Sequence, residues 1–543
     1  MVIVLQRRAD IVSAVIDSAE PQIVGDLATF VATHERNKPR WVWDDTARWY
    51  PELLAARVRV ERCFDLRLCH TILRNSSLTA DSSLARAPRG GWDAPAPLEV
   101  PVRESGALFD LDDAAQSPTE LDAVSEFELQ SSAVAESAEP GRIGRLLAAE
   151  SAGALIATEM QFAGLPWRED EHDAILSRIL GPRPAAGERP EYMRRLLMEV
   201  REALEAPELN PDSPADLLKA LGQVGLQVTS TRSWELKQLE HPAIAPLLEY
   251  KKLSRLLSAN GWHWLDTWVA DGRFRPDYVP GGVVTGRWAT SGGGALQLPK
   301  QIRGAVVADD GWMLVVADAA QLEPRILAAL AGDKGMVAAG AAGDLYAGIV
   351  ASGAVETRDQ AKVAMLGAMY GATTGESGRL MPRLAKAYPL AIGMVEDAAR
   401  AGERGEIVTT RLGRSSPPGR GQAYDESASA AEVARARNSA RAWGRFTRNF
   451  IVQGTAAEWA LCWMASIRRR LSELAQGAWF TEAPHLVFFL HDEIVVHCPA
   501  EFADRVAIEV RAAAVEAGQL VFGAIPAEFP VTVAIVADYG QAK

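Results

Sequence analysis

The chain has 543 residues, of which 48% are hydrophobic and 23% charged, and this composition excludes a wholly disordered protein. At about 100–200 residues per domain, the length predicts about three or four domains. No apolar run approaches the roughly 18 residues of a membrane span, and the N-terminus, MVIVLQRRAD, lacks the charge order of a signal peptide. We therefore expect a cytoplasmic protein with no membrane partner.

The cysteines and the distribution of charge indicate which compartment and which kinds of ligand to expect. The four cysteines form no Cys-x-x-Cys pair, so we expect a reducing compartment and no structural zinc. The net charge of −13 is uneven, with 16 basic and 24 acidic residues in 1–150 but 15 and 9 in 357–448. Such a basic block is typical of a surface that binds a polyanion, although charge alone favours a helical surface solvated by arginine.

The N-terminal quarter is predicted to be a small α/β unit followed by a linker. Short apolar runs alternate there with turn signals, at Pro21–Val24, Trp41–Trp43 and Val58–Val60. Residues 84–140 are rich in Ala, Pro, Ser, Asp and Glu, which predicts a linker that holds a short helix. A helical pattern then runs from about Gly144 to Gly164.

The remainder is predicted to be mostly helical, with strands in two places. Helices extend to about Ala259, and one of them has Asp212 or Ser213 as its cap and Pro214 in its first turn. Strands and glycine-rich turns are expected in 260–345, helices in 355–475, and two or three apolar strands around one helix (501–518) in 485–537.

The segment LVVADAAQLEPRILAAL places a carboxylate at the end of a buried strand. Leu314–Ala317 is a continuous apolar run that stops at Asp318, and Pro324 suits the first turn of the helix that follows. A carboxylate in this position can hold a hard cation such as Mg²⁺, or it can cap the helix. Taken alone, the segment favours the cap.

The segment HLVFFLHDEIVVHCP predicts a hairpin with an acidic tip. Two apolar strands, Leu486–Leu490 and Ile494–Val496, flank the tip residues His491, Asp492 and Glu493. The tip has none of the usual turn residues, and adjacent carboxylates repel unless a cation offsets them. Together with Asp318, the tip therefore suggests two strands whose carboxylates share metal ions, rather than an ordinary polar turn.

Two further segments place polar side chains along helix faces. In TRDQAKVAMLGAMYG, steps of four residues put one stripe on Arg358, Lys362, Leu366 and Tyr370. This stripe suits a polyphosphate and a base or sugar, or else it is a solvated Arg and Lys beside a buried Leu and Tyr.

In RFTRNFIVQGTAAEWA, the same step aligns Arg445, Asn449 and Gln453, after which we expect Gly454 to interrupt the helix. Such side chains can reach base edges or sugars in a minor groove, although an ordinary polar helix face is favoured without further support. Upstream, the glycine-rich stretch TGRWATSGGGALQLPKQIRGAVV supplies Arg287, Gln297 and Arg303. The alternative is that this stretch is only a flexible surface loop.

Taken in order, these segments resemble the family A DNA polymerases, the bacterial DNA polymerase I group. The order is TGR…LQ…IRGA, DxxQxExR, RxxxKxxxxxxxYG, RxxxNxxxQGTAA and HDE, and LLEYKKLSRL and DSPADLLKALGQVGLQV are also similar to family segments. The resemblance covers residues 145–543. It implies an α/β multidomain right-hand fold, with a thumb at 144–260, palm at 261–340 and 425–543, fingers at 341–424, and a small exonuclease-like domain with linker at 1–143.

The resemblance also implies site roles. Asp318 and Asp492 would ligate two Mg²⁺ ions, for which Mn²⁺ can substitute, with the Ala319 carbonyl helping and Glu493 close by. Arg358 and Lys362 would hold the triphosphate of a dNTP, and Lys362 would serve as general acid toward pyrophosphate. Glu323 would crowd a ribose 2′-OH, with Gln321 ordering that site, Tyr370 under the templating pair and His491 near the primer terminus. A further set would contact the primer–template: Arg287, Gln297, Arg303, Arg445, Asn449 and Gln453.

Several positions depart from the family pattern. Leu366 stands where the family has an aromatic residue near the incoming sugar, which puts nucleotide discrimination in doubt. Ala319 and Ala320 replace a Tyr-Ser pair, Ala295 replaces an Asn, and Pro324 replaces a Leu. None of these changes removes a carboxylate expected to bind metal.

The N-terminal region is expected to be an exonuclease-like domain that has lost activity. A 3′–5′ exonuclease needs several carboxylates around two metals, including an Asp-x-Glu on its first strand. The first strand candidate, Val2–Leu5, holds no acid. Asp44, Asp45 and Asp65 are the acids that would contradict this expectation, unless they are surface carboxylates.

The sequence therefore predicts a monomeric, template-directed DNA polymerase that acts in repair or gap filling, with primer–template DNA and dNTPs as its partners. The runner-up is a degenerate protein that binds primer–template with little synthesis, which Leu366 and the paired alanines support. A third hypothesis is a single-subunit RNA polymerase, against which Glu323 and the HDE triplet argue.

Overall fold

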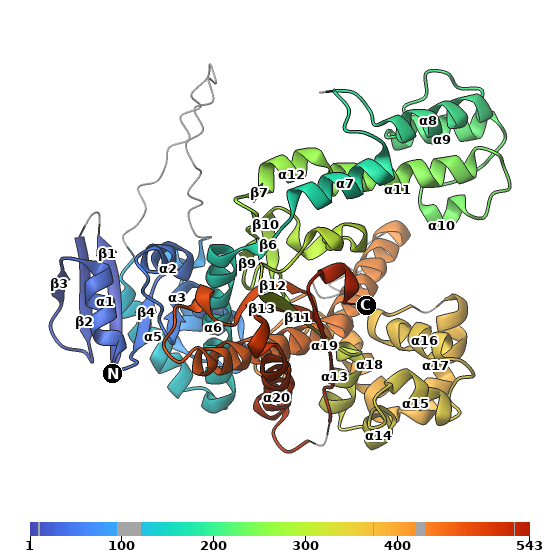
Figure 1. Cartoon of the computed structure of the whole chain (residues 1–543). Coiled ribbons are helices and arrows are strands. Elements are labelled where there is room, and N and C mark those ends of the chain that lie inside the picture. The colour runs from blue at the N-terminus through green and yellow to red at the C-terminus, as the bar shows by residue number, and fades with distance from the viewer. Residues whose placement is uncertain are drawn as a thin grey trace.

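A computed structural model describes residues 1–8, 11–94, 121–185, 187–372, 374–419, 429–525 and 527–542. Figure 1 shows an N-terminal lobe on the left, a β-sheet in the centre, and two groups of helices on the right, one above the other. The fold is mixed α/β and rich in helices, as the sequence predicts.

The N-terminal lobe is built on a five-stranded sheet in the order β3-β2-β1-β4-β5. Its strands are β1 (Val2–Arg8), β2 (Ile11–Ile16), β3 (Gln22–Val24), β4 (Arg40–Trp43) and β5 (Cys63–Asp65). The pairings β1–β2 and β2–β3 are antiparallel, whereas β1–β4 and β4–β5 are parallel. The apolar run Val58–Val60, in contrast, is a loop that leads into β5.

Six helices accompany this sheet: α1 (Leu27–Glu35), α2 (Thr46–Ala55), α3 (Leu66–Asn75), α4 (Ser83–Arg86), α5 (Ala123–Ala135) and α6 (Pro140–Ala163). The expected linker lies outside the described residues at 95–120. From residue 121 onward it is replaced by α5, which packs on α3 and β1, and by α6, which begins at Pro140 rather than near Gly144.

The upper group of helices comprises α7 (Glu169–Leu180), α8 (Glu191–Ala203), α9 (Pro214–Gln223), α10 (Ser233–Leu236), α11 (Ile244–Asn260) and α12 (Trp262–Trp268). The Ser213 side chain caps α9 by accepting from the Asp216 N–H, and Pro214 is its first residue, as predicted. Two small sheets connect this group to the centre. One has the order β6-β8-β7, with β6 (Leu165–Pro166), β7 (Val269–Ala270) and β8 (Arg273–Phe274), and the other pairs β9 (Asp277–Val279) with β10 (Ala289–Gly292).

The central sheet has the order β12-β13-β11-β14, with all neighbours antiparallel. Its strands are β11 (Trp312–Ala319), β12 (His485–Leu490), β13 (Glu493–Pro499) and β14 (Val531–Val536). The middle of β11 and nearly all of β12 and β13 are buried on both faces. This explains why their sequences are continuous apolar runs instead of alternating ones.

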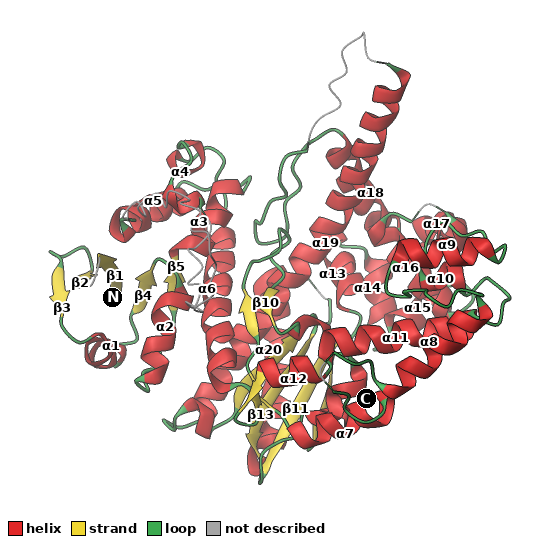
Figure 2. Cartoon of the chain, turned by 90° about the horizontal axis from the view of Figure 1, so that it is seen from above, coloured by secondary structure: helices red, strands yellow, loops and turns green. Residues whose placement is uncertain are grey.

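Helices α13 (Leu322–Ala331), α19 (Ala430–Leu474) and α20 (Ala503–Phe522) connect and cover the central sheet. The lower group comprises α14 (Lys334–Gly340), α15 (Leu345–Ala351), α16 (Arg358–Tyr370), α17 (Gly375–Ala387) and α18 (Pro389–Glu403). Figure 2 shows α18 beside the long helix α19, and these two helices pack extensively.

The expectation that Gly454 interrupts its helix is wrong, because α19 runs unbroken through it. A Cβ on Gly454 would lie 2.5 Å from Thr410 Cγ2, so the glycine is needed for close packing of a loop against the helix. This loop, residues 404–419, leads away from the end of α18 and is called the 404–419 loop below.

A buried ion pair joins α19 to the N-terminal lobe. The Arg468 guanidinium binds the Glu159 carboxylate of α6 (2.6 Å) and donates to the carbonyls of Val60 (2.6 Å) and Glu61 (2.7 Å). Arg59 and the Tyr50 hydroxyl also donate to Glu159. Burial acts to raise the pKa of Glu159, but the two guanidinium groups outweigh it and hold that pKa well below its usual range.

Removing one partner of this buried pair is expected to destabilise the protein strongly. Arg468→Met leaves Glu159 with a single cation and two carbonyls without their donor, so we expect a loss of about 3–5 kcal/mol in the free energy of unfolding. Arg57 is the control, because its exposed ion pair with Glu482 also joins the N-terminal lobe to a residue in the C-terminal part of the chain. Arg57→Ala should cost less than about 1 kcal/mol. Equal losses on urea denaturation would contradict the assignment.

Candidate active site

The central sheet brings the two predicted metal-binding carboxylates to one edge. Asp318, at the end of β11, stands opposite Glu493 in the β11–β13 register, and the Ala319 N–H donates to the Asp492 carbonyl (2.9 Å). Asp318 and Asp492 therefore lie on adjacent backbone segments although they are far apart in the sequence. Asp318 does not cap α13, because that helix begins after Gln321. The capping alternative is therefore excluded.

Two residues with left-handed backbones flank these carboxylates. Gln321 follows Asp318 with φ 56°, and His491 precedes Asp492 with φ 61°. Non-glycine residues rarely adopt this conformation, and where they do the surrounding contacts must hold it. In this chain it turns the backbone sharply at both positions, so that the helix α13 and the strand β13 start immediately beside the carboxylates.

The hairpin tip is shorter than predicted. Leu490 pairs with Glu493, so the turn consists of His491 and Asp492, and Glu493 is the first residue of β13. Glu493 is buried; it accepts hydrogen bonds from Arg303 (2.9 Å) and from the Tyr539 hydroxyl. Arg303 also lies over the Tyr539 ring at 4.5 Å. Arg303 and Glu493 therefore form a buried support beneath the tip, and the alternative of a flexible surface loop is wrong for Arg303.

A chain of polar contacts joins three helices, α13, α16 and α19, to the loop between β9 and β10. Glu323, in the first turn of α13, pairs with Arg287 and accepts from the Tyr370 hydroxyl at the end of α16 (3.2 Å). Gln453 of α19 donates to the same hydroxyl (3.0 Å). Four residues predicted from separate motifs are thus directly connected.

The α16 stripe is exposed along its whole length. Arg358 and Lys362 are exposed, and so are Leu366 (38%) and Tyr370 (43%), while the opposite face of the helix is buried. The alternative of a buried Leu and Tyr beside solvated cations is therefore wrong. The exposed apolar part of the stripe instead remains available to contact a ligand.

The α19 stripe meets the end of α16. Asn449 and Gln453 are half-buried and Arg445 is exposed, and a Cβ on Gly371 would lie 2.9 Å from Arg445 Cγ. The aliphatic part of Arg445 thus packs against the glycine that ends α16. Gln297 is exposed on a short 3₁₀ helix, Ala295–Gln297.

A cavity of about 540 Å³ lies between these elements, and Arg287, Glu323, Gln453, His491 and Asp492 line it. Its remaining wall is largely apolar and comes mainly from α19, through Ala456, Ala457, Ala460, Leu461 and Met464. Burial, and then the neighbouring Arg287, lower the pKa of His491. A largely apolar lining with a few polar groups is typical of a ligand site.

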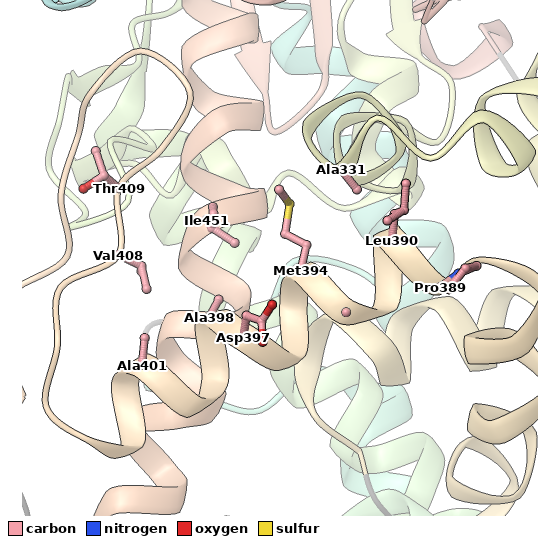
Figure 3. A pocket seen from close by; sticks show the side chains of 11 residues that line it. Ala331, Pro389, Leu390, Met394, Asp397, Ala398, Ala401, Val408, Thr409 and Ile451 are labelled. Carbon is pink, nitrogen blue, oxygen red and sulfur yellow. The ribbon is translucent and has the colours of Figure 1, made fainter.

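A second cavity, of about 530 Å³, lies away from the carboxylates, between α18, the 404–419 loop and α19 (Figure 3). Its lining is apolar except for Thr409 and Asp397; Leu390, Met394 and Ile451 are typical members. It contains none of the predicted site residues.

Asp344 is a site residue that sequence analysis did not identify. Its carboxylate accepts from Arg358 Nε (2.7 Å) and from Gln321 Nε2 (2.7 Å), and it also caps α15. The cap position before an apolar helix is its only local signal in the sequence. Its contact with Arg358 depends on the packing of α15 against α16.

The acids of the N-terminal lobe act as structural groups. Asp45 caps α2, Asp65 caps α3, and Asp44 pairs with Arg48 and accepts from the Trp49 indole. Asp65 also binds both the N–H and the hydroxyl of Thr46. Burial, and then the nearby Asp45, raise the pKa of Asp65 to about 7.

The comparisons with known proteins agree with this architecture. The structure superimposes on the POL domain of Pol1 from M. smegmatis, solved in complex with DNA primer–template and dNTP, with a TM-score of 0.68 and 19% identity. That match covers 98% of this chain and 93% of the other. The fold is therefore that of a polymerase domain.

Residues 187–540 match the model of DNA polymerase family A, and the chain belongs to this family. It is 28% identical over 398 residues to the thermostable DNA polymerase I of Thermus thermophilus, covering 63% of this chain and 45% of the relative. It is 29% identical over 325 residues to the DNA polymerase I of Chloroflexus aurantiacus, covering 54% and 32%. The chain thus spans less than half the length of these relatives.

The contact between Glu458 of α19 and the 404–419 loop should make the free energy of unfolding depend on pH. Glu458 of α19 binds the Thr410 hydroxyl and the Leu412 N–H (2.8 Å), and burial raises its pKa to about 7 from a usual 4.5. Because this pKa is higher in the folded chain than in the unfolded chain, the contribution of Glu458 to the free energy of unfolding is complete below about pH 4.5 and is lost as the pH rises to about 7. Glu458→Gln can keep both hydrogen bonds without ionising, so relative to wild type it should gain up to about 3 kcal/mol between about pH 5 and pH 8.

Thermal unfolding at the two pH values measures this gain. The exposed Glu473 on the same helix gives the control Glu473→Gln, whose effect should be equally small at both. A pH-independent effect of Glu458→Gln would contradict the buried neutral carboxyl.

Proposed function

We propose that this chain is a template-directed DNA polymerase that joins a primer 3′-OH to the α-phosphate of a dNTP and releases pyrophosphate. The observation that carries the proposal is the meeting of Asp318 and Asp492 at one sheet edge, beside a cavity bounded by the Glu323–Arg287 pair and Gln453. Family membership and the fold of a polymerase domain support it.

The donor set at the sheet edge fits Mg²⁺. The Asp318 and Asp492 carboxylates and the Ala319 carbonyl are hard oxygen ligands, and they would hold the two ions, with Mn²⁺ as a substitute. Among the described residues no cluster of three His, Cys, Asp or Glu side chains forms a closed metal cage. Mg²⁺ commonly uses one or two carboxylates and completes its shell with waters and substrate phosphates. When bound, the ions would activate the attacking oxygen and neutralise charge on the phosphates.

The side chains around this edge divide the remaining work. Arg358 and Lys362 would offer cations to the triphosphate from one exposed face, and Lys362 would protonate the leaving pyrophosphate. Glu323, which Arg287 and Tyr370 hold in place, would crowd a ribose 2′-OH. Leu366 offers an aliphatic surface to the incoming nucleotide.

The primer–template would lie along the cavity and the α19 stripe. Arg287, Gln297, Arg445, Asn449 and Gln453 present donors to a minor groove, and His491 is close to the primer terminus in this arrangement. Arg303 and Glu493 act from below by fixing the hairpin tip, since both are buried.

The N-terminal lobe is proposed to lack nuclease activity. Its strand β1 carries no acid, and Asp44, Asp45 and Asp65 are occupied as helix caps and hydrogen-bond acceptors. A role in repair or gap filling, in the nucleoid and as a monomer, is consistent with a polymerase of this kind. None of the described helices is both long and apolar enough to cross a membrane.

A catalytically degenerate protein that binds primer–template is the second candidate. Leu366, in place of an aromatic residue, and the pair Ala319–Ala320 favour it. The complete set of carboxylates and cations favours synthesis.

Primer extension with wild type and two variants tests the proposal. Asp318→Ala and Asp492→Ala each remove one metal-binding carboxylate, so extension should fall by about 100-fold or more while DNA binding is retained. Asp310, an exposed carboxylate just before β11, gives the control Asp310→Ala, which should keep wild-type activity. Near-normal extension by either site variant rejects the metal role.

The same assay separates the alternatives. Wild type that binds DNA but does not extend it identifies the degenerate binding protein. Shortening of the primer without dNTPs would show an active exonuclease.

Glu323→Ala tests the sugar gate. Removing the carboxylate opens room for a 2′-OH, so discrimination between dNTP and rNTP should fall by about 10- to 100-fold in kcat/KM. Tyr370→Phe removes the hydroxyl that bonds Glu323 and Gln453 but leaves the Glu323 carboxylate in place, so it should have a smaller effect. Unchanged rNTP use by Glu323→Ala rejects the gate, and preferred rNTP use by wild type would indicate an RNA polymerase.

A further inference from the structure

We propose that Asp344 is a positioning residue for the incoming nucleotide: it holds the Arg358 guanidinium by its Nε edge and ties it to Gln321, beside the catalytic carboxylate Asp318. This inference rests on the proposed function, because it assigns Arg358 to the triphosphate. It adds a residue for which the sequence motifs give no role.

The two oxygens of Asp344 have different partners. Oδ1 accepts from Gln321 Nε2 (2.7 Å), from the Tyr346 N–H (3.0 Å) and from the Ala347 N–H (3.2 Å). Oδ2 accepts from Arg358 Nε (2.7 Å). Three donors on one oxygen fix the orientation of the carboxylate, so that the other oxygen presents a fixed acceptor to Arg358.

Gln321 completes the link to the sheet edge. Its side-chain Nε2 donates to Asp344, and its side-chain Oε1 accepts from the Leu345 N–H (2.8 Å). These reciprocal bonds also account for the left-handed backbone of Gln321, because they hold the residue in a conformation that it would otherwise rarely adopt. The start of α15 is thereby bound to the turn that follows Asp318 and Ala319.

The geometry leaves Arg358 able to bind an anion. The bond to Asp344 uses the Nε–H, and the N–H groups on the two terminal nitrogens are the ones that pair with phosphate oxygens. The Arg358 side chain is 55% exposed, and it also lies over the Tyr346 ring at 5.5 Å. A long, flexible side chain is thus held from one edge and from one face before the nucleotide arrives, which reduces the entropy lost on binding.

The hydrogen bonds to Asp344 also change the pKa of its carboxyl group. Burial acts to raise the pKa of Asp344, but hydrogen bonds from Arg358 and Gln321 lower it to about 2. The group is therefore ionised at any working pH and does not release Arg358 by protonation.

A simple charge argument predicts the opposite effect of mutation, which makes the test sharp. Removing a negative charge near a triphosphate should strengthen nucleotide binding by relieving repulsion. If Asp344 positions Arg358, its loss should weaken binding because the guanidinium becomes free to move.

Asp344→Asn is the informative variant. An asparagine Oδ1 can still accept from Gln321, Tyr346 and Ala347 and still cap α15, whereas its Nδ2 presents N–H groups to the Arg358 Nε–H and breaks only that contact. Asp397→Asn is the control, since it makes the same change at an exposed Asp–Arg pair on α18.

Single-nucleotide incorporation by the full chain gives the first readout. We expect Asp344→Asn to raise the KM for dNTP about tenfold with kcat changed by less than about threefold. Asp397→Asn should resemble wild type. In an Arg358→Ala background, Asp344→Asn should change KM by less than about twofold, because its effect acts through the arginine.

Unchanged or lower KM in Asp344→Asn, a fall in kcat alone, or additive effects in the double variant would each overturn the proposal. Equilibrium binding of dNTP to the protein–DNA complex gives a readout that does not need turnover. If the wild-type chain binds dNTP but does not extend the primer, and Asp344→Asn binds dNTP more weakly than wild type, the role of Asp344 is supported and polymerase activity is rejected. A wild-type chain that binds no dNTP would overturn both.

Discussion

The candidate active site depends on one backbone pairing, the antiparallel ladder between β11 and β13. This ladder sets Asp318 against Glu493 and the Ala319 N–H against the Asp492 carbonyl. Side chains alternate between faces along a strand, so a slip of one residue would move Asp318 to the other face of the sheet. The ends of the apolar runs help to fix the register, because a shifted pairing would bring Asp318 or the hairpin tip against the apolar interior of the sheet. The chemistry proposed for the edge is thus a consequence of how the core packs.

Polar side chains around this edge are held by partners from other elements. Arg303 fixes Glu493, Tyr370 and Arg287 fix Glu323, and Asp344 fixes Arg358. Each contact joins two different segments of the chain, so the arrangement exists only in the folded chain. Side chains oriented before the substrate binds lose less entropy on binding and need less rearrangement during reaction. In the proposed phosphoryl transfer, the protein would therefore contribute largely by orienting charge.

The sequence predicted the local features well and the long-range ones poorly. The strands that carry Asp318 and Leu490, and the single helix that aligns the α16 stripe, follow from apolar runs and helical periodicity, which are local signals. The low helix propensity of glycine predicts a break at Gly454, but propensity is a weak signal, and the packing of Thr410 against the helix overrides it. The burial of Arg303 and the link from Asp344 to Arg358 depend on which elements meet, and neither leaves a periodic trace in the sequence. Motif order identified the family, but it could not show which charged residues support others.

The Arg468 network has a consequence for how the chain can be divided. Its guanidinium takes acceptors from three places at once: the carboxylate of Glu159 and the backbone carbonyls of Val60 and Glu61. A fragment that starts at α6 would keep the cation and the carboxylate but lose both carbonyls, the Tyr50 hydroxyl and the second cation, Arg59. A buried arginine would then face solvent or an unfilled space on the surface uncovered by the missing sheet. The N-terminal lobe is therefore an integral wall of the polymerase body and not a detachable module, whatever chemistry its own residues retain.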